Sequence, residues 1–151
     1  MNMDDLDRNL LRALAKDATT SAGALGRRFG ISQPAAWRRI KRLHDEGVIK
    51  GRRVVLDAQA VGFGVTVFLG VKLATKGRVS LDDFERAVTA IPEVQSVQHV
   101  LGMYDYRLRV VAHDISDFER VLRRRIMTLP GVGDVEANVL LSEERRLGPL
   151  G

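Results

Sequence analysis

The chain has 151 residues, of which 45% are hydrophobic and 28% are charged, a composition typical of globular proteins and not of disordered or fibrous ones. It contains no cysteine, which excludes disulfides, thiolate nucleophiles and cysteine-ligated metal sites. We therefore expect a reducing compartment, the cytoplasm, and no cofactor. The amino terminus lacks the features of a secretion signal, and the longest apolar run, residues 60–71, is too short to cross a bilayer.

The net charge of +5 is unevenly distributed along the chain. Residues 1–60 contain 12 Lys and Arg against 7 Asp and Glu, whereas residues 61–151 contain 12 against 12. A local basic excess raises the encounter rate with polyanions and displaces condensed counterions from DNA. Charge alone leaves open the alternative of a solvated basic face.

Apolar spacing predicts three helices in the first 50 residues. The first covers about residues 5–16, and the second, capped by Thr20 or Ser21, covers about residues 22–29 and ends at Gly30.

The third helix begins at Ser32, has Pro34 in its first turn, and is ended by Gly47. Its apolar face consists of Ala36, Ile40 and Leu43.

The short second and third helices and the tight turn between them match the helix-turn-helix motif, whose second helix enters the major groove of DNA. Gly26 supports this interpretation, because a glycine inside an exposed helix costs about 1 kcal/mol relative to alanine and so indicates a closely packed helix. Simple tolerance of the glycine is the alternative.

The DNA-binding candidates lie on the polar side of the third helix or in the basic turn after it. They are Ser32, Gln33, Trp37, Arg38, Lys41, Arg42, Arg52 and Arg53. Gln33 is expected to pair with adenine and Arg38 with guanine, because an amide and a guanidinium match adjacent edge groups of those bases. Lys41 and Arg42 are expected to contact phosphates.

Three features of this region have alternative interpretations. Trp37 is either part of the DNA-reading face or a partly buried wedge against the first helix. Arg39 is expected to form a structural ion pair with an acidic residue near the end of its own helix or on the first helix. Residues 48–57 indicate a β-hairpin turning at residues 50–53, as in the wing of a winged helix, or a plain surface hairpin.

The rest of the chain predicts two β-α-β halves. Strands are expected at about residues 63–73, 94–101, 106–112 and 135–142, and a helix at about 81–91. Residues 83–86 and 91–94 are echoed by residues 117–120 and 129–132, with phenylalanines 34 apart and prolines 38 apart. The helix of the second half is therefore expected to be four residues longer, which is about one turn and preserves the direction of its apolar face.

The order βαββαβ predicts an α+β fold of the ferredoxin-like, or ACT-like, type. Two helices cover one face of such a sheet. The other face is expected to bind a second copy of the chain, because Val97, Leu101, Val139 and Leu141, with the long first strand, exceed the apolar positions of one face.

The connection between the second and third strands, residues 101–106, contains a glycine and an acidic residue. A plain hairpin explains this connection without any function. Alternatively, Asp105 faces the ammonium group of a small zwitterion held beside Gly102. The histidines show no metal-ligand spacing, and we expect no metal site.

The sequence argues against two other function classes. An enzyme is not expected, because no nucleophile-base pair, phosphate loop or paired acidic site is evident in the sequence. RNA binding is disfavoured because the third strand reads Arg107-Leu108-Arg109-Val110-Val111 and lacks the stacking aromatic residues of RNA-recognition domains.

Several motifs in this order resemble the Lrp/AsnC family of transcriptional regulators over nearly the full chain. They are Asp4-Asp5-Leu6-Asp7-Arg8-Asn9-Leu10-Leu11; Ile31-Ser32 followed by Arg39-Ile40, Leu43 and Gly47-Val48-Ile49; Gly102 with Asp105-Tyr106; and Leu129-Pro130-Gly131-Val132. The resemblance implies a winged helix-turn-helix domain over residues 1–50, a strand-like linker over 51–62, and a ligand-sensing and oligomerisation domain over 63–151.

The resemblance also implies the partners: double-stranded DNA at the nucleoid, and homodimers that assemble into octamers of four dimers, with amino acids bound between dimers. The implied effector residues are Leu101, Gly102, Met103, Tyr104, Asp105, Tyr106 and Ala137. The family often has a small polar residue where this chain has Leu101, and its amino-acid-binding members often have threonine where this chain has Ala137. We therefore expect an apolar or aromatic amino acid as the effector, or none.

Overall fold

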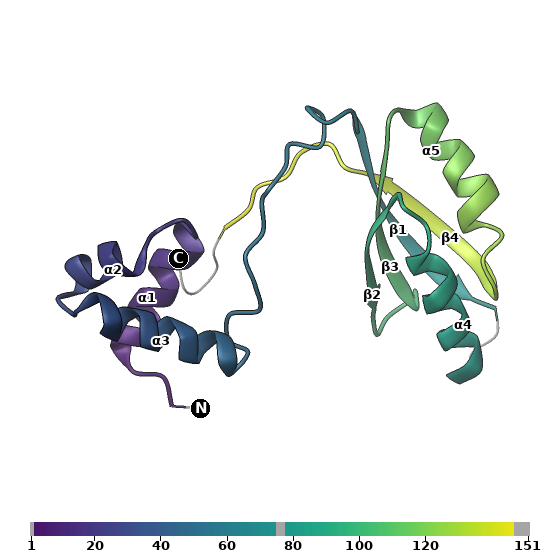
Figure 1. Ribbon diagram of the computed structural model, residues 1–151. Coiled ribbons are helices and arrows are strands. Elements are labelled where there is room, and N and C mark those ends of the chain that lie inside the picture. The colour runs from purple at the N-terminus through teal and green to yellow at the C-terminus, as the bar shows by residue number, and fades with distance from the viewer. Residues whose placement is uncertain (1, 75–77, 147–151) are drawn as a thin grey trace. The chain divides into compact units, whose positions relative to one another are not determined.

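The computed structural model describes residues 2–74 and 78–146 (Figure 1). The chain forms two compact units: the first contains the described residues up to Val55 together with residues 144–146, and the second contains Leu56–Glu143.

The first unit contains three helices, α1 (Asp5–Lys16), α2 (Ala22–Phe29) and α3 (Gln33–Asp45). Each begins at a side chain that accepts a hydrogen bond from a backbone N–H of the first turn: Asp4 for α1, Ser21 for α2 and Ser32 for α3. Such caps satisfy amide groups that have no partner inside the helix. The predicted bounds of the first two helices are confirmed.

The turn between α2 and α3 is held by two glycines. Gly30 ends α2 in the left-handed region, with φ of 71°, which a residue without a side chain adopts at little cost. At Gly26 a Cβ atom would lie 2.6 Å from the carbonyl oxygen of Ile31. The close neighbour expected at Gly26 is therefore present, but it is the backbone of the turn and not another helix.

The core of the first unit consists of side chains from all three helices. Its buried members are Leu10, Ala13, Leu14, Leu25 and Ile40, with Leu6, Phe29 and Ile49 packed against them.

The wing hairpin expected after α3 is absent, since the described residues between α3 and β1 include no strand. The amides of Val48 and Ile49 both donate to the carbonyl oxygen of Leu43, so this backbone closes the end of α3 and pairs with no strand. The following residues leave Val54 and Val55 largely exposed. In a single chain the segment is thus an extended connection.

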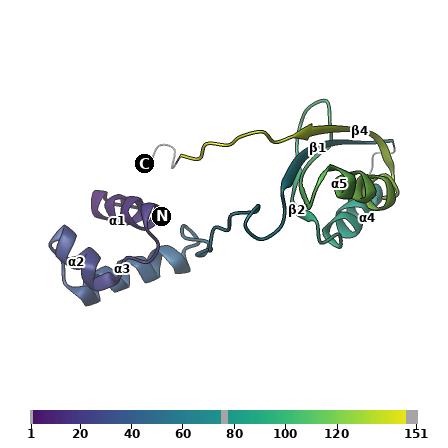
Figure 2. The same cartoon turned by 90° about the horizontal axis from the view of Figure 1, so that it is seen from above.

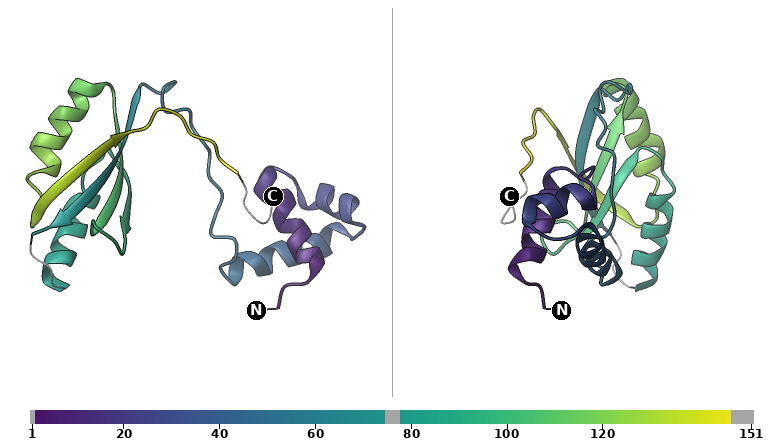
Figure 3. Two further views of the ribbon diagram at one scale, coloured as in Figure 1. Left: turned by 180° about the vertical axis from the view of Figure 1, so that it is seen from behind. Right: turned by 60° about the vertical axis from the view of Figure 1, so that its left-hand side comes forward.

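The second unit confirms the βαββαβ order and the α+β class. Its elements are β1 (Val65–Leu73), α4 (Arg78–Thr89), β2 (Val94–His99), β3 (Tyr106–Ala112), α5 (Ile115–Val121) with its π-helical continuation η1 (Leu122–Ile126), and β4 (Val132–Val139). The sheet order is β2-β3-β1-β4 with antiparallel neighbours throughout. Helices α4 and α5 lie on the same side of the sheet (Figure 2; Figure 3).

The core of this unit lies between the sheet and the two helices. It includes Val67, Leu69 and Val71 of β1, Tyr106, Leu108 and Val110 of β3, and Phe84, Val88, Phe118, Val121 and Ile126 of the helices. The strand predicted at 94–101 begins at the predicted residue but ends two residues earlier, and the strand predicted at 135–142 was placed three residues too far toward the carboxyl terminus. Beyond His99 the chain forms a loop, and β4 begins three residues earlier because Val132 already pairs with Leu73.

The longer spacing in the second half of the repeat is accommodated by a π-helical turn. Met127 N donates to the carbonyl oxygen of Leu122, five residues before it, and this brings Val121 and Ile126 to the same buried face. Helix α5 also begins closer to its phenylalanine than α4 does: Ile115 precedes Phe118 by three residues, whereas Arg78 precedes Phe84 by six. The helical segments are therefore of equal length, 12 residues for α4 and 7 with a further 5 for α5 and η1, contrary to the prediction.

The apolar surplus expected on the other face of the sheet is not present. Val97 pairs with Leu108, and Val139 pairs with Val67, so both point to the side that the helices cover. Leu101 and Leu141 belong to no strand. We call the uncovered side the open face; its residues include Phe68, Lys72, Arg107, Arg109, Asp134 and Glu136.

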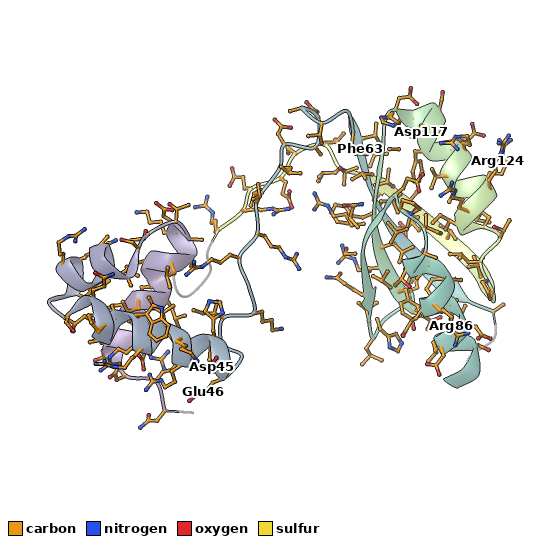
Figure 4. The ribbon with its side chains drawn as sticks, in the orientation of Figure 1. Asp45, Glu46, Phe63, Arg86, Asp117 and Arg124 are labelled. Atoms are coloured by element: carbon orange, nitrogen blue, oxygen red, sulfur yellow. The ribbon has the colours of Figure 1, made fainter. Side chains whose placement is uncertain are left out.

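Residues just before β1 are anchored to the second unit. The ring of Phe63 stacks on that of His113 at 5.0 Å between centroids, and His113 Nδ1 lies 2.7 Å from the carbonyl oxygen of Gly62. The His113 N–H in turn donates to Asp117 on α5, which Figure 4 places near Phe63. The end of the connection at residues 62–63 is thereby fixed against α5.

Candidate functional site

The outward face of α3 presents most of the side chains predicted to bind DNA. Ser32 is the cap residue: its Oγ accepts a hydrogen bond from Ala35 N at 3.2 Å. Gln33 and Arg38 are exposed, and Arg38 has no side-chain partner among the residues that the structure describes. Lys41 bridges to Asp45, one turn later near the end of the helix, with 2.7 Å between Nζ and Oδ2 (Figure 4).

The remaining two arginines of α3 are bound to acidic residues at the start of α1. Arg39 Nη1 lies 2.7 Å from Asp4 Oδ2 and 3.0 Å from Asp7 Oδ1. Arg42 Nη2 lies 2.5 Å from Asp7 Oδ2. The structural ion pair predicted for Arg39 therefore forms with the first helix, and Arg42, predicted to contact phosphates, is paired within the protein.

These contacts also affect titration at the start of α1. A hydrogen bond from Asp7 N, and after it one from Arg39, lower the pKa of Asp4 below its usual value of 3.8.

Trp37 is 55% exposed and does not form a buried wedge. It lines a hollow of about 700 Å³ between α3 and the connection from α1 to α2. The other lining residues are Ala18, Thr19, Thr20, Ser21, Ala22, Ile40, Lys41, His44 and Arg52. The hollow combines hydroxyl groups, an indole and basic side chains, with no acidic residue in its lining.

Arg52 and Arg53 lie in the extended segment after α3 and are both exposed. Because the hairpin is absent, this backbone does not form the predicted wing. Together with Lys50 they extend the basic character of the first unit beyond the end of α3.

The predicted effector loop joins β2 to β3. Leu101 and Met103 are exposed, and a Cβ atom at Gly102 would meet open space. Asp105 is held on β1: its N–H donates to the carbonyl oxygen of Val71 at 2.9 Å, and its Oδ2 accepts from Leu73 N at 2.8 Å. One oxygen of this carboxylate therefore already accepts a hydrogen bond from β1, which extends the pairing of β3 with β1.

Tyr104 folds back from the loop over the open face. A Cβ atom at Gly70 would lie 2.8 Å from the ring of Tyr104. A hydrogen bond with Glu136 is the main cause that raises the pKa of the Tyr104 hydroxyl. Because Glu136 pairs with Gly70 across the sheet, this loop is connected to both β1 and β4.

Two predicted effector residues lie elsewhere within the single chain. Tyr106 is buried, and its hydroxyl donates to Glu85 Oε1 at 2.5 Å; burial, followed by that bond, raises its pKa. Ala137 pairs with Leu69 and so lies on the helix side of the sheet, opposite to Tyr104. The structure does not bring Ala137 to the loop.

Four residues that shape these sites, Asp4, Asp7, Gly70 and Glu136, were not individually predicted to be site residues. The spacing of Asp4 and Asp7 is that of a capping box, which was a usable signal for the start of α1. Gly70 interrupts a strand interior, a position that often marks close approach by another group. Glu136 had no comparable signal.

Within residues 2–74 and 78–146, no group of three or more His, Asp or Glu side chains is placed to hold a metal ion. No helix in the same ranges combines the length and hydropathy needed to cross a membrane.

Comparison with known proteins connects these features to a family. Residues 3–44 match the model of the AsnC-type helix-turn-helix domain, and residues 66–149 match that of the Lrp/AsnC ligand binding domain.

Full-length relatives agree with both matches. The chain is 35% identical over 147 residues to a proline dehydrogenase transcriptional activator of Rhizobium radiobacter, covering 97% of this chain and 94% of the relative. It is 36% identical over 141 residues to a glutamate uptake regulatory protein of Zymomonas mobilis, covering 93% and 85%.

A solved structure shares the fold as well. A transcriptional regulator from Neisseria meningitidis, crystallised as a complex with L-Met, superimposes with a TM-score of 0.89 at 26% identity and covers 96% of this chain and 94% of its own. The chain therefore belongs to the Lrp/AsnC family of transcriptional regulators.

Proposed function

We propose that this protein binds specific sequences of double-stranded DNA through α3 and regulates transcription in response to an amino acid effector. The observation that carries the proposal is the outward face of α3, where an exposed, unpaired arginine follows the capped amino-terminal turn of a helix-turn-helix. Residues 1–50 serve as the DNA-binding domain, 51–62 as the linker, and 63–151 as the effector-binding and oligomerisation domain. The site of action is the nucleoid in the cytoplasm.

Base reading is assigned to the amino-terminal half of α3. Gln33 and Arg38 are exposed there, and their amide and guanidinium groups match pairs of adjacent groups on adenine and guanine edges. Trp37 lies between them in sequence and presents an exposed indole. Lys41, with Arg52 and Arg53 of the extended segment, supplies contacts to the phosphate backbone.

Selection of duplexes from a random pool, followed by Arg38→Ala, tests the DNA-binding proposal. Loss of one base-reading arginine is expected to weaken binding to the selected duplex about 5- to 150-fold, from roughly 1–3 kcal/mol, with a smaller loss on random duplex. Arg8→Ala, which removes an exposed arginine of α1, is the matched control. Equal losses on both duplexes would reduce Arg38 to a phosphate contact. Failure to enrich any duplex, or a preference for single-stranded RNA, would reject the proposed function.

Assembly is assigned to the open face of the sheet. Arg107 on β3 and Glu136 on β4 lie in one row on either side of Gly70, and Phe68 contacts Arg109 at 5.5 Å from its ring centroid. A twofold axis parallel to β1 brings the basic row of one copy opposite the acidic row of the other. The homodimer is therefore held by complementary charges on the open face and not by an apolar surplus. Four such dimers form the octamer.

The effector is assigned to the exposed β2–β3 loop in the assembled protein. Leu101, Gly102 and Met103 offer apolar contacts and open backbone, while polar side chains of the loop are engaged with the sheet. An apolar amino acid suits such a surface, and one relative binds L-Met. Effector binding then alters assembly, and so DNA affinity, by a coupling free energy of typically 1–3 kcal/mol.

Thermal shift with the twenty amino acids, combined with sedimentation at equal protein concentration, tests the effector assignment. Stabilisation by apolar amino acids and a changed sedimentation profile are expected. Stabilisation by polar amino acids alone would contradict the assignment, and a monomer at all concentrations would contradict the assembly.

A further inference from the structure

Three arginines lie side by side on one flank of α3. Arg38 and Arg39 are adjacent, and Arg42 follows them one helical turn later; with Ala35 the three line a shallow hollow of about 350 Å³. Guanidinium groups in this arrangement on a DNA-facing helix are expected to attract phosphates without regard to sequence. Only Arg38 is without a side-chain partner among the described residues, because the other two bind Asp4 or Asp7.

Asp7 is the centre of this arrangement. Its side chain is 1% exposed and is the only buried charged side chain found in the described ranges. The two carboxylate oxygens are shared between α3 and the cap of α1: Oδ1 accepts from Arg39, and Oδ2 accepts from Arg42 and from Asp4 N. Asp7 therefore joins two α3 arginines to the rigid start of α1.

A carboxylate and a phosphate compete for the same guanidinium. Arginine donates in a planar fork that fits both anions, and a pair shielded from solvent is weakened less by salt than an exposed one. An arginine bound to Asp7 is thus less available to a passing phosphate than a free arginine would be. Sequence-independent affinity depends on the number of phosphates that Lys and Arg neutralise.

We propose that Asp7 is a specificity-determining positioning residue, which holds Arg39 and Arg42 on the protein so that Arg38 alone of the three reads DNA. This inference rests on the proposed function of α3. Removal of the Asp7 charge releases one or both arginines to phosphates. Binding to random DNA then becomes tighter, while discrimination in favour of the selected duplex falls.

The test compares Asp7→Asn with Asp5→Asn in the full chain. Both remove one negative charge from the first turn of α1, but Asp5 is exposed and has no arginine partner among the described residues. The probe is duplex DNA of random sequence at salt concentrations from about 50 to 200 mM. Each new phosphate contact is expected to increase the loss of affinity across that range about 3-fold, because the salt slope steepens by about 0.9.

The expected result is tighter random-duplex binding and a steeper salt slope for Asp7→Asn than for Asp5→Asn. The double variant Asp7→Asn/Arg42→Gln is expected to return both quantities toward the wild type. A purely structural role for Asp7 would weaken binding to both duplexes and would not be rescued in this way. Equal behaviour of Asp7→Asn and Asp5→Asn, or absence of rescue, overturns the inference.

Arg42→Gln and Arg38→Gln decide the question if Asp7→Asn does not fold. The inference expects Arg42→Gln to change affinity for the selected duplex less than 2-fold and Arg38→Gln to lower it about tenfold. Equal losses for the two variants overturn it. Wild-type protein that binds no duplex at all would instead reject the proposed function, so the two failures are distinguishable.

Discussion

The two units of the chain use charged residues in different ways. In the first unit, Asp4 and Asp7 of one helix bind arginines of another that are more than 30 residues away in sequence. In the second unit, most helix ion pairs are local, such as Asp83 with Arg86, at spacings of three or four residues. The exception is Arg125 of η1, which lies 3.3 Å from Glu93, 32 residues away in sequence. Local exposed ion pairs contribute only about 0.2–0.5 kcal/mol each to the free energy of unfolding. Their main effect is to balance charge on the surface.

This contrast separates two tasks. Ion pairs of the first unit fix the position of α3 and decide which of its cations remain available. Charges of the second unit balance one another and leave rows of opposite sign on the open face, which suit association with a second copy. Substitutions of the same kind in each unit, Gly→Ala or Asp→Asn, test whether the two units differ in this way.

Gly26→Ala is expected to have the largest effect. The added Cβ would lie 2.6 Å from a backbone oxygen of the turn to α3, and that backbone cannot move without disturbing the helix-turn-helix. Overpacking of this kind typically costs about 1–3 kcal/mol in the free energy of unfolding. Thermal and urea unfolding monitored by Trp37 fluorescence measures the loss. Gly51→Ala, where a Cβ meets no atom within 4 Å, is the control, and equal stabilities for both variants would contradict the interpretation.

Gly70→Ala is expected to have a smaller effect on stability and a larger one on the effector loop. Its Cβ would collide with the ring of Tyr104. That side chain can rotate away, but it then loses its hydrogen bond with Glu136. We expect a loss of about 0.5–1.5 kcal/mol, the usual net contribution of one hydrogen bond, and faster amide exchange in residues 101–105. Hydrogen-exchange mass spectrometry measures the latter.

Tyr104→Phe provides the matched control for Gly70→Ala. It removes the hydroxyl but keeps the ring over Gly70, so exchange in the loop is expected to change less. The interpretation predicts that a clash with fixed backbone, as at Gly26, costs more than a clash with a side chain that can move, as at Gly70. Equal destabilisation by Gly70→Ala and Gly26→Ala would contradict it.

Sequence periodicity was sufficient for most of the fold. Helix α1 has a regular apolar stripe, and the first residues of β3 alternate between buried and more exposed positions, so the bounds of both were predicted correctly. Both signals are local and are therefore readable from one segment at a time.

The errors arose where structure depends on distant partners. The hairpin after α3 was inferred from β-rich composition, but no strand of the described residues pairs with residues 50–57. The carbonyl oxygen of Leu43 accepts from the amides of Val48 and Ile49, where the hairpin would begin. The side of the sheet to which Val97 points depends on a register shift between Val94 and Ser96, which no local pattern reveals.

The candidate site divides in the same way. Exposure of Gln33 and Arg38 follows from the helical phase of α3, which the sequence specifies. The pairing of Arg42 with Asp7 does not, because it joins residues 35 apart whose contact depends on the crossing of two helices. Long arginine side chains reach either solvent or a neighbouring helix from the same position, and periodicity does not distinguish these outcomes.

Acidification is expected to have the smallest effect, and it tests whether the units respond independently. Asp4 in the first unit and Asp117 in the second both have a pKa lowered below 3.8, mainly by backbone N–H donors, from Asp7 and from His113 respectively. A carboxyl with a lowered pKa in the folded state stabilises fully above 3.8, and the contribution disappears as pH falls through the lowered value. Both groups are exposed, so water screens the effect.

Asp4→Asn and Asp117→Asn remove the titrating group but keep an acceptor for the same N–H. Each is expected to flatten the acid-induced loss of stability only in its own unit. Unfolding followed between about pH 6 and pH 2 by NMR signals of α1 and α5 amides measures the two responses separately. A change in the α5 signals on Asp4→Asn, or in the α1 signals on Asp117→Asn, would mean that the units unfold as one. The division of tasks between them would then require an energetic coupling that their separate cores do not provide.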